Sequence, residues 1–182
     1  MKILLIFVTI FIAVRAETIK CNSQLSEVLN EGTHLKFFTL GKFIFEGNIT
    51  FRYRALDGPA DGTIKLFSTM GSETHPNDRN SLSITFTLKE GTVLRSTNDK
   101  GEKQIEIKHL ANPLKYETRT GNILRIQILK NYHKIYVNEN ETPFVVFPRF
   151  DKGEPVKYLG LLGNFYPSKI YLDCTKARQD VK

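Results

Sequence analysis

One stretch of the sequence, Asn122–Phe150, constrains the fold more than any other part of the chain. It contains three short apolar runs separated by two polar turns. In the first run apolar and polar residues alternate with the period of two that is typical of a half-buried strand. The predicted strands centre on Leu124, Ile126 and Ile128, then on Ile135 and Val137 after a break at Asn131–His133, and then on Phe144–Phe147 before Pro148. Strands that follow one another in steps of about ten residues are typical of an antiparallel sheet.

The same alternation recurs along most of the chain, and no segment of ten or more residues has the period of a helix. We expect Glu17–Asn30 to begin as coil with at most a short helical turn, and Met70–Asn80 to form a mobile loop. The count of roughly ten to twelve strands predicts an all-β fold, an antiparallel two-sheet β-sandwich. Further strands are predicted at His34–Leu40, Phe43–Phe45, Ile49–Tyr53, Ile64–Ser68, Leu82–Leu88, Val93–Arg95, Ile105–Ile107, Val156–Gly163 and Ile170–Leu172. The predicted core contains Phe51, Ile64, Phe86, Leu124, Ile126, Ile128, Val137, Val146 and Leu161.

Residues 1–16 have the layout of a secretory signal peptide. Lys2 provides a positive start, Ile3–Ile12 is apolar, and Ala16 ends the segment with a small residue. The alternative, a membrane anchor, needs about 20 apolar residues, and Arg15 interrupts this run. We therefore expect residues 1–16 to be removed, residues 17–174 to form one sandwich domain, and residues 175–182 to be a charged, flexible tail. The mature protein is expected to be secreted and extracellular, and not to span a membrane.

The charge of the chain is basic but scattered. Its 26 Lys and Arg residues and 19 Asp and Glu residues give a formal net charge of +7, which falls to +5 without Lys2 and Arg15. The densest basic segments, Lys100–Lys108 and Lys152–Lys157, both include acids. Because the sequence has no basic stripe, we expect no nucleic-acid partner. Attraction to anionic glycans or to membrane surfaces stays open.

Two cysteines, Cys21 and Cys174, lie near the two ends of the strand pattern. In an oxidising compartment an even number of cysteines predicts a disulfide. This bond would join the first residues of the mature chain to its last strand. On the chain-entropy model, closing so long a loop stabilises a fold by about 4–5 kcal/mol. Two free thiols or an intermolecular bond are the alternatives.

The sequence contains no recognisable catalytic, metal-binding or cofactor-binding motif. There is no nucleophile elbow, no glycine run that would cradle a phosphate and no dinucleotide fingerprint. A glycosidase pair of carboxylates cannot be chosen from sequence alone. The four histidines, each of which we expect at the surface rather than in catalysis, have no zinc-site spacing: His34, His75, His109 and His133. We predict a protein that binds its ligand without transforming it and uses no cofactor.

Two N-glycosylation sequons fall at predicted turns or strand starts, Asn48-Ile49-Thr50 and Asn140-Glu141-Thr142. A glycan at such a position can extend into water. Because the chain is expected to enter the secretory route, we predict that Asn48 and Asn140 are modified. The alternative is that accessible sequons stay unmodified.

Several short elements of the C-terminal half form a distinctive set. They are Val137-Asn138-Glu139, Phe144–Phe147, Pro148-Arg149 and Gly163-Asn164-Phe165, with Thr120-Gly121 before the strand Ile123–Ile128. Together they resemble the C-terminal half of a galectin carbohydrate-recognition domain. Gly47–Tyr53 and Ile64–Ser68 suit the family's early strands, so the resemblance covers roughly Leu35–Leu172. It implies a galectin/concanavalin-like jelly roll and a lectin function.

The chain departs from the family where the sugar is bound. Galectins bind β-galactosides through a His, an Asn and an Arg on one strand, an Asn on the next, and a Trp followed by Glu and Arg. This chain has no Trp, and neither Ile64–Met70 nor Ile84–Lys89 contains the His, Asn and Arg set. The position nearest the second Asn reads Arg95-Ser96-Thr97. A site that reads hydroxyls loses most of its discrimination without these partners, so we predict that the usual galactoside site is absent. The signal peptide and the cysteine pair also depart from typical members of the family.

A less specific resemblance links the chain to farnesoic-acid O-methyltransferase-type domains. Phe51–Ala55, Ile64–Phe67 and Val156–Gly160 are similar to elements of that family, but its characteristic Trp residues are missing.

The sequence therefore predicts a secreted galectin-like carbohydrate-binding protein with a divergent sugar site. Its expected partners are glycans or glycoproteins, anionic ones among them, because Arg and Lys replace the family's neutral readers. The polar residues expected in the groove are Thr85, Thr87, Lys89, Arg95, Ser96, Lys103 and Glu106. A solvated outer face is the alternative for this set. The alternative functions are a protein-interaction or structural module on the same sandwich with the lectin site lost, and a small-molecule-binding or enzymatic domain of the O-methyltransferase type.

Overall fold

The computed structural model of the chain describes residues 17–26, 36–53, 62–69, 79–87, 91–97, 104–110, 122–149, 154–163 and 167–174. Within these ranges the regular elements are all strands, thirteen in number. They are β1 Glu17–Ile19, β2 Ser23–Ser26, β3 Lys36–Ile44, β4 Gly47–Tyr53, β5 Gly62–Thr69, β6 Arg79–Thr87, β7 Gly91–Thr97, β8 Gln104–Leu110, β9 Asn122–Ile128, β10 Tyr132–Val137, β11 Val145–Pro148, β12 Val156–Gly163 and β13 Lys169–Asp173. No helix in this part of the chain is long and apolar enough to cross a membrane. The predicted signal peptide and C-terminal tail lie outside these ranges.

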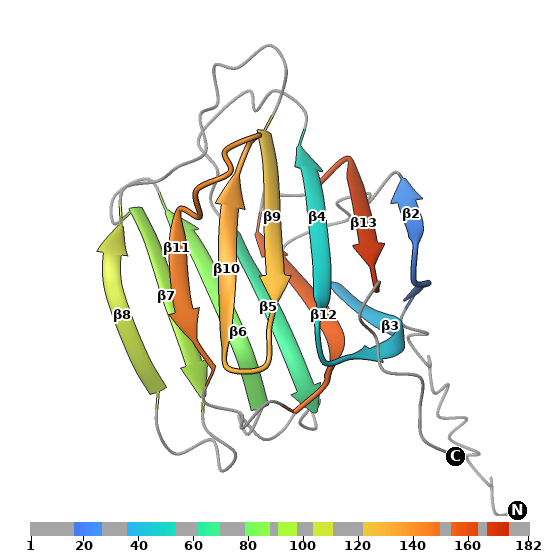
Figure 1. Cartoon of the computed structure of the whole chain (residues 1–182), viewed down its shortest axis with the longest axis horizontal. Coiled ribbons are helices and arrows are strands. Elements are labelled where there is room, and N and C mark those ends of the chain that lie inside the picture. Colours follow the sequence, from blue (N-terminus) through green and yellow to red (C-terminus); the bar gives the residue numbers. More distant parts are fainter. Residues whose placement is uncertain are drawn as a thin grey trace, which may run out of the picture.

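The strands form two sheets that face each other (Figure 1). One sheet has seven strands in the order β1-β3-β12-β5-β6-β7-β8, and the other has six in the order β11-β10-β9-β4-β13-β2. All neighbouring strands pair antiparallel except β1 and β3, which are parallel. The predicted two-sheet β-sandwich is confirmed.

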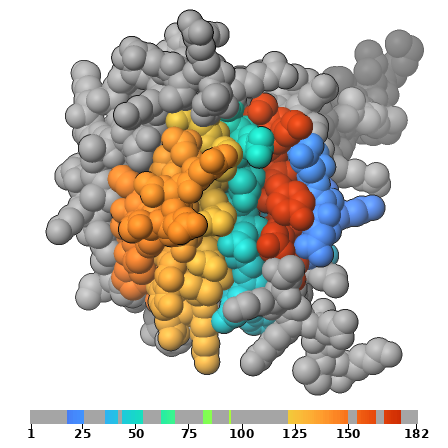
Figure 2. Space-filling view, turned by 45° about the horizontal axis from the view of Figure 1, so that its top comes forward, coloured from blue at the N-terminus to red at the C-terminus, as the bar shows by residue number. Residues whose placement is uncertain are grey.

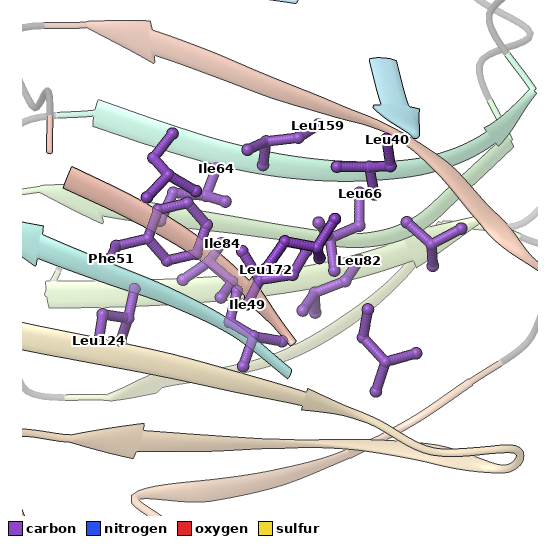
Figure 3. Packing of buried hydrophobic residues seen from close by; sticks show 14 of the residues in the cluster. Leu40, Ile49, Phe51, Ile64, Leu66, Leu82, Ile84, Leu124, Leu159 and Leu172 are labelled. Atoms are coloured by element: carbon purple, nitrogen blue, oxygen red, sulfur yellow. The ribbon is translucent and has the colours of Figure 1, made fainter. Parts of the chain in front are cut away.

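The core lies between the two sheets, where both contribute every second side chain (Figure 3). In β9 the residues Asn122, Leu124, Ile126 and Ile128 are buried and the residues between them are more exposed. This strand pairs with β4 in a register that places Leu124 opposite Phe51. Paired residues share a face of the sheet. The apolar alternation of one strand is therefore continued by its neighbours.

Most of the predicted core is confirmed, and one residue of it is wrong. The confirmed residues are Phe51, Ile64, Leu124, Ile126, Ile128 and Leu161. Val137 is partly buried and packs against the core. The side chain of Phe86 is not among those that the structure describes. Val146 is 51% exposed, because in the alternation of β11 its neighbour Phe147 takes the core position. Val146 instead pairs with Lys134 on the outer face.

The N-terminal segment is not coil as predicted, because it forms two short strands on different sheets. β1 pairs with β3 in the seven-stranded sheet, and β2 pairs with β13 in the six-stranded one. Asn22, whose φ of 53° is in the left-handed region that Asn tolerates, turns the chain between them. Its backbone N–H donates to Leu172 O (2.7 Å), and its Oδ1 accepts from Cys174 N–H (3.2 Å). Tertiary pairing, which local propensity does not report, creates both strands.

The Cys21–Cys174 disulfide is confirmed at the point where the chain crosses between the sheets. The two Cα atoms are 5.4 Å apart, well within bridging range. Because β2 is hydrogen-bonded to β13, the first and last strands of the six-stranded sheet are neighbours. The bond therefore closes one edge of the sandwich.

Four local predictions differ from the structure. The expected break at Asn131–His133 is shorter, because β10 begins at Tyr132. His133 is fully buried rather than at the surface, since the register places it between Ile128 of β9 and Phe147 of β11. β3 runs continuously through Gly41 as one strand. β6 begins at Arg79, inside the predicted loop, whose residues 70–78 lie outside the described ranges.

Arg149 joins three segments at one end of the sandwich. It is 8% exposed, and its Nη1 donates to Leu129 O (3.0 Å) and Phe45 O (3.4 Å). Its Nη2 donates to the carbonyl of Glu154, and its backbone N–H donates to Asn131 O (2.9 Å). One guanidinium therefore holds the carbonyls of the β3–β4 turn, the β9–β10 turn and the segment before β12.

Candidate functional site

A polar row crosses four strands on the outer face of the seven-stranded sheet. Lys65 of β5 pairs with Ser83 of β6, Ser83 pairs with Arg95 of β7, and Arg95 pairs with Glu106 of β8. In β7, Arg95 follows Leu94, which is fully buried in the core. Paired residues share a face, so the register places all four positions on the face that points away from the core. For Arg95 and Glu106 this placement comes from the backbone alone.

A pair of hydroxyl groups lies beside this row. Thr63 of β5 and Thr85 of β6 are in register, and their Oγ1 atoms form a hydrogen bond of 3.1 Å in which either hydroxyl is able to donate. Both side chains are partly exposed. The pair stands two residues along each strand from Lys65 and Ser83, about 6–7 Å away. Hydroxyl groups that both donate and accept suit the recognition of sugar hydroxyls.

An aromatic pair borders the polar groups on the side of β3. The ring centroids of Phe37 and Phe67 are 5.8 Å apart, with the ring planes tilted by 49°. Phe67 is fully buried but does not belong to the cluster between the sheets. Phe37 is only partly buried. A half-exposed ring next to hydrogen-bonding groups combines an apolar surface with polar readers.

The structure brings some of the predicted site residues together and separates others. Thr85, Arg95 and Glu106 lie on neighbouring strands in the outward register. Thr87 pairs with Gly91 at the end of β6 and β7. Ser96 pairs with Ile105 and shares the alternation of the buried Leu94, not that of Arg95. Lys89 and Lys103 lie outside the described residues.

Sequence reasoning missed Ser83 of β6 and, on β5, Thr63 and Lys65. The two β5 residues alternate with the buried Ile64 and Leu66, so the pattern already indicated an outward face. Only the order of strands in the sheet places that face beside β6. Within the described ranges no group of three or more His, Cys, Asp or Glu residues could hold a metal ion.

Solved structures with the same arrangement of strands are galectins. The galectin LEC-6 of Caenorhabditis elegans superposes with a TM-score of 0.58 at 18% identity, over 75% of this chain and 89% of that one. Sheep galectin-11 gives 0.52 at 14% identity over 79% and 99%, and CG-16, a homodimeric agglutinin from chicken liver, gives 0.52 at 15% identity over 77% and 100%. No protein-family model and no curated protein sequence matches the chain. The chain therefore has the fold of a galectin-like carbohydrate-recognition domain.

Proposed function

We propose that this chain is a secreted carbohydrate-binding protein that uses the outer face of β5–β8 to bind an anionic glycan without transforming it. The observation that carries the proposal is the row Lys65–Ser83–Arg95–Glu106. The register places Lys65, Arg95 and Glu106, with the nearly buried Ser83 between the two cations, on one face of a galectin-like sandwich, where the chain lacks the residues that bind galactose in the family. The similar structures include a galectin and an agglutinin, which supports a lectin function by analogy of fold.

The charges of the row favour a ligand with both hydroxyl and acidic groups. Lys65 and Arg95 flank Ser83 from its two neighbouring strands, so their backbones are about 10 Å apart. An acidic substituent held between them receives charge-assisted hydrogen bonds from one or both. The hydroxyls of Thr63 and Thr85 suit neutral hydroxyls of the same sugar, and the register places the acid Glu106 on the strand next to Arg95. A sulfated saccharide carries both kinds of group.

Secretion and glycosylation belong to the same proposal. The Cys21–Cys174 disulfide supports passage through an oxidising compartment. Asn140 is exposed in the turn between β10 and β11, which favours it as a glycan acceptor. Asn48 is also part of the proposal, although its Nδ2 donates to Asp173 Oδ2 at 3.3 Å within the sheet.

The test is a titration of the secreted protein with a sulfated galactoside and with its unsulfated parent. Lys65→Gln and Arg95→Gln remove one cation each from the row, and Lys20→Gln is the matched control because Lys20 is exposed between β1 and β2. We expect each row variant to weaken binding of the sulfated sugar by about tenfold, and added salt to weaken it further. The control is expected to bind like the unmodified protein.

Two results would count against the proposal. Tight, salt-insensitive binding of the neutral galactoside would show that the usual site is retained in another form. A glycan array without any bound saccharide would favour the alternative of a protein-interaction or structural module on this sandwich.

A further inference from the structure

On the opposite side of the sandwich, the outer face of the six-stranded sheet, three cations from β13, β4 and β9 lie next to one another, and Lys134 of β10 lies further across the same face. Lys169 of β13 pairs directly with Arg52 of β4. Arg52 pairs with Ile123 of β9, so Arg125 is its diagonal neighbour on the same face, about 7–8 Å away between Cα atoms. All three side chains are exposed. Figure 2 shows β13, β4 and β9 side by side on this surface.

No described acid balances this group. Two like charges directly opposite each other on neighbouring strands are unfavourable, yet Lys169 and Arg52 stand in that position. The acid of β13 on the same face, Asp173, is four residues from Lys169, about 13 Å along the strand. It accepts a hydrogen bond from Asn48. Because no acid among the described residues neutralises the three cations, they form a positive surface that attracts an anion from outside the chain.

The surroundings hold one of the cations in place and add an exposed ring. The guanidinium of Arg125 lies 4.2 Å from the ring centroid of Tyr136, whose hydroxyl donates to Gln127 Oε1 at 3.2 Å. Stacking on a fixed ring orients the guanidinium while its N–H groups remain able to donate. Tyr171 is 42% exposed and stands two residues from Lys169 on the same face. We call Arg52, Arg125, Lys169 and Tyr171 the β13–β4–β9 patch.

We propose that the β13–β4–β9 patch binds sulfate groups of an extended sulfated glycan chain. Two guanidinium groups and an ammonium within two strand spacings carry three positive charges and supply charge-assisted donors to adjacent sulfate groups, each of which carries one negative charge. The Tyr171 ring offers a surface for a sugar ring. Docking on an anionic membrane is typical of clusters of about four to eight cations, more than the patch has. Single-stranded nucleic acid needs successive stacking rings along a basic groove, whereas the patch has one exposed ring.

This inference does not rest on the polar row of β5–β8, because the two lie on opposite faces of the sandwich. Each is therefore able to fail without the other. The patch also explains how a chain with scattered charge presents a local basic surface, since its members are brought together only by the pairing of β13, β4 and β9.

The experiment measures binding of a heparin-derived octasaccharide and of its desulfated form by titration calorimetry. The patch variant carries Arg52→Gln, Arg125→Gln and Lys169→Gln, and therefore loses three positive charges. The matched control, Lys20→Gln with Lys36→Gln and Lys130→Gln, removes three charges elsewhere. All proteins are also prepared with Asn48→Gln, because a glycan on Asn48 would lie on the same face. Thermal unfolding verifies that each variant folds, and the single variant Lys169→Gln serves if the triple one does not.

We expect the patch variant to lose at least about tenfold in affinity for the octasaccharide and to show a shallower salt dependence, with the control nearly unchanged. The desulfated chain should bind weakly to every protein. Equal losses in the patch variant and the control would overturn the inference in favour of net charge alone. A loss confined to Arg95→Gln would assign the octasaccharide to the β5–β8 row instead. The inference would also be overturned if the protein bound phosphatidylserine vesicles more strongly than the octasaccharide and the patch variant lost this binding. The surface would then be a membrane site.

Discussion

Replacing Arg149 by Met should destabilise the sandwich strongly, because a single side chain serves three backbone carbonyls at one end of it. Met has a similar length and is apolar, so the variant removes the N–H donors with little change in volume. The carbonyls of Phe45, Leu129 and Glu154 then lose their bonds to the guanidinium. A fully buried acceptor left without a partner costs about 1–3 kcal/mol, and these three acceptors are part-buried.

Two features of the structure reduce the total cost of losing these three hydrogen bonds. Arg149 is 8% exposed, so water is able to reach part of the vacated site. The 3.4 Å bond to Phe45 is the longest of the set and contributes least. Three acceptors at about 1–3 kcal/mol each, reduced in this way, give an expected loss of about 3–5 kcal/mol in the free energy of unfolding. For a domain of this size that corresponds to a decrease in Tm of roughly 6–20 °C.

Denaturation in urea, monitored by circular dichroism, measures this loss. The slope of the free energy with urea should stay constant if only the native state is affected. Lys130→Met is the control, because Lys130 is exposed in the β9–β10 turn and its replacement should change stability by no more than about 0.5 kcal/mol. Arg149→Lys should fall between the two, since one ammonium cannot reproduce the planar fork. A loss below about 1 kcal/mol for Arg149→Met would refute the role of this side chain in joining the three segments.

Three further predictions concern the core, the disulfide and alkaline pH. Ile126→Ala, at a fully buried position of β9, should cost about 2–5 kcal/mol, and an unchanged Tm would contradict its place between the sheets. Replacing Cys21 and Cys174 by Ser opens a loop of 153 residues and should cost about 4–5 kcal/mol, seen as an earlier midpoint in denaturant; equal midpoints with and without reductant would argue against it. Burial raises the pKa of Tyr53 well above 10.0, so the native state keeps this proton when the unfolded chain releases it. The contribution of Tyr53 to the free energy of unfolding is therefore fully present below pH 10 and declines above pH 10 by about 1.4 kcal/mol per pH unit. Comparison with Tyr53→Phe, in which this decline should vanish, isolates the effect.

Much of the fold could be predicted because period-two alternation is a local property. Leu124, Ile126 and Ile128 are buried as predicted, since each strand that covers a core repeats the same in-and-out pattern. The disulfide followed from the number of cysteines and their places at the two ends of the pattern. The predictions failed where the local sequence has little apolar alternation. β1 and β2 have few apolar residues and exist because β3 and β13 are available to pair with them.

The candidate surfaces were less accessible to sequence reasoning, because they depend on which strands are neighbours. Arg95 and Glu106 were both expected in the groove from the sequence, but their direct pairing and the place of Ser83 come from register, and the place of Lys65 comes from strand order. Arg52, Arg125 and Lys169 are separated by many residues along the chain and read as scattered charge. The class of the fold, the alternation of most strands and the cysteine pair could be predicted because they depend on residue type and local spacing. Which charges share a face could not, because hydrogen bonding between distant strands sets register and strand order.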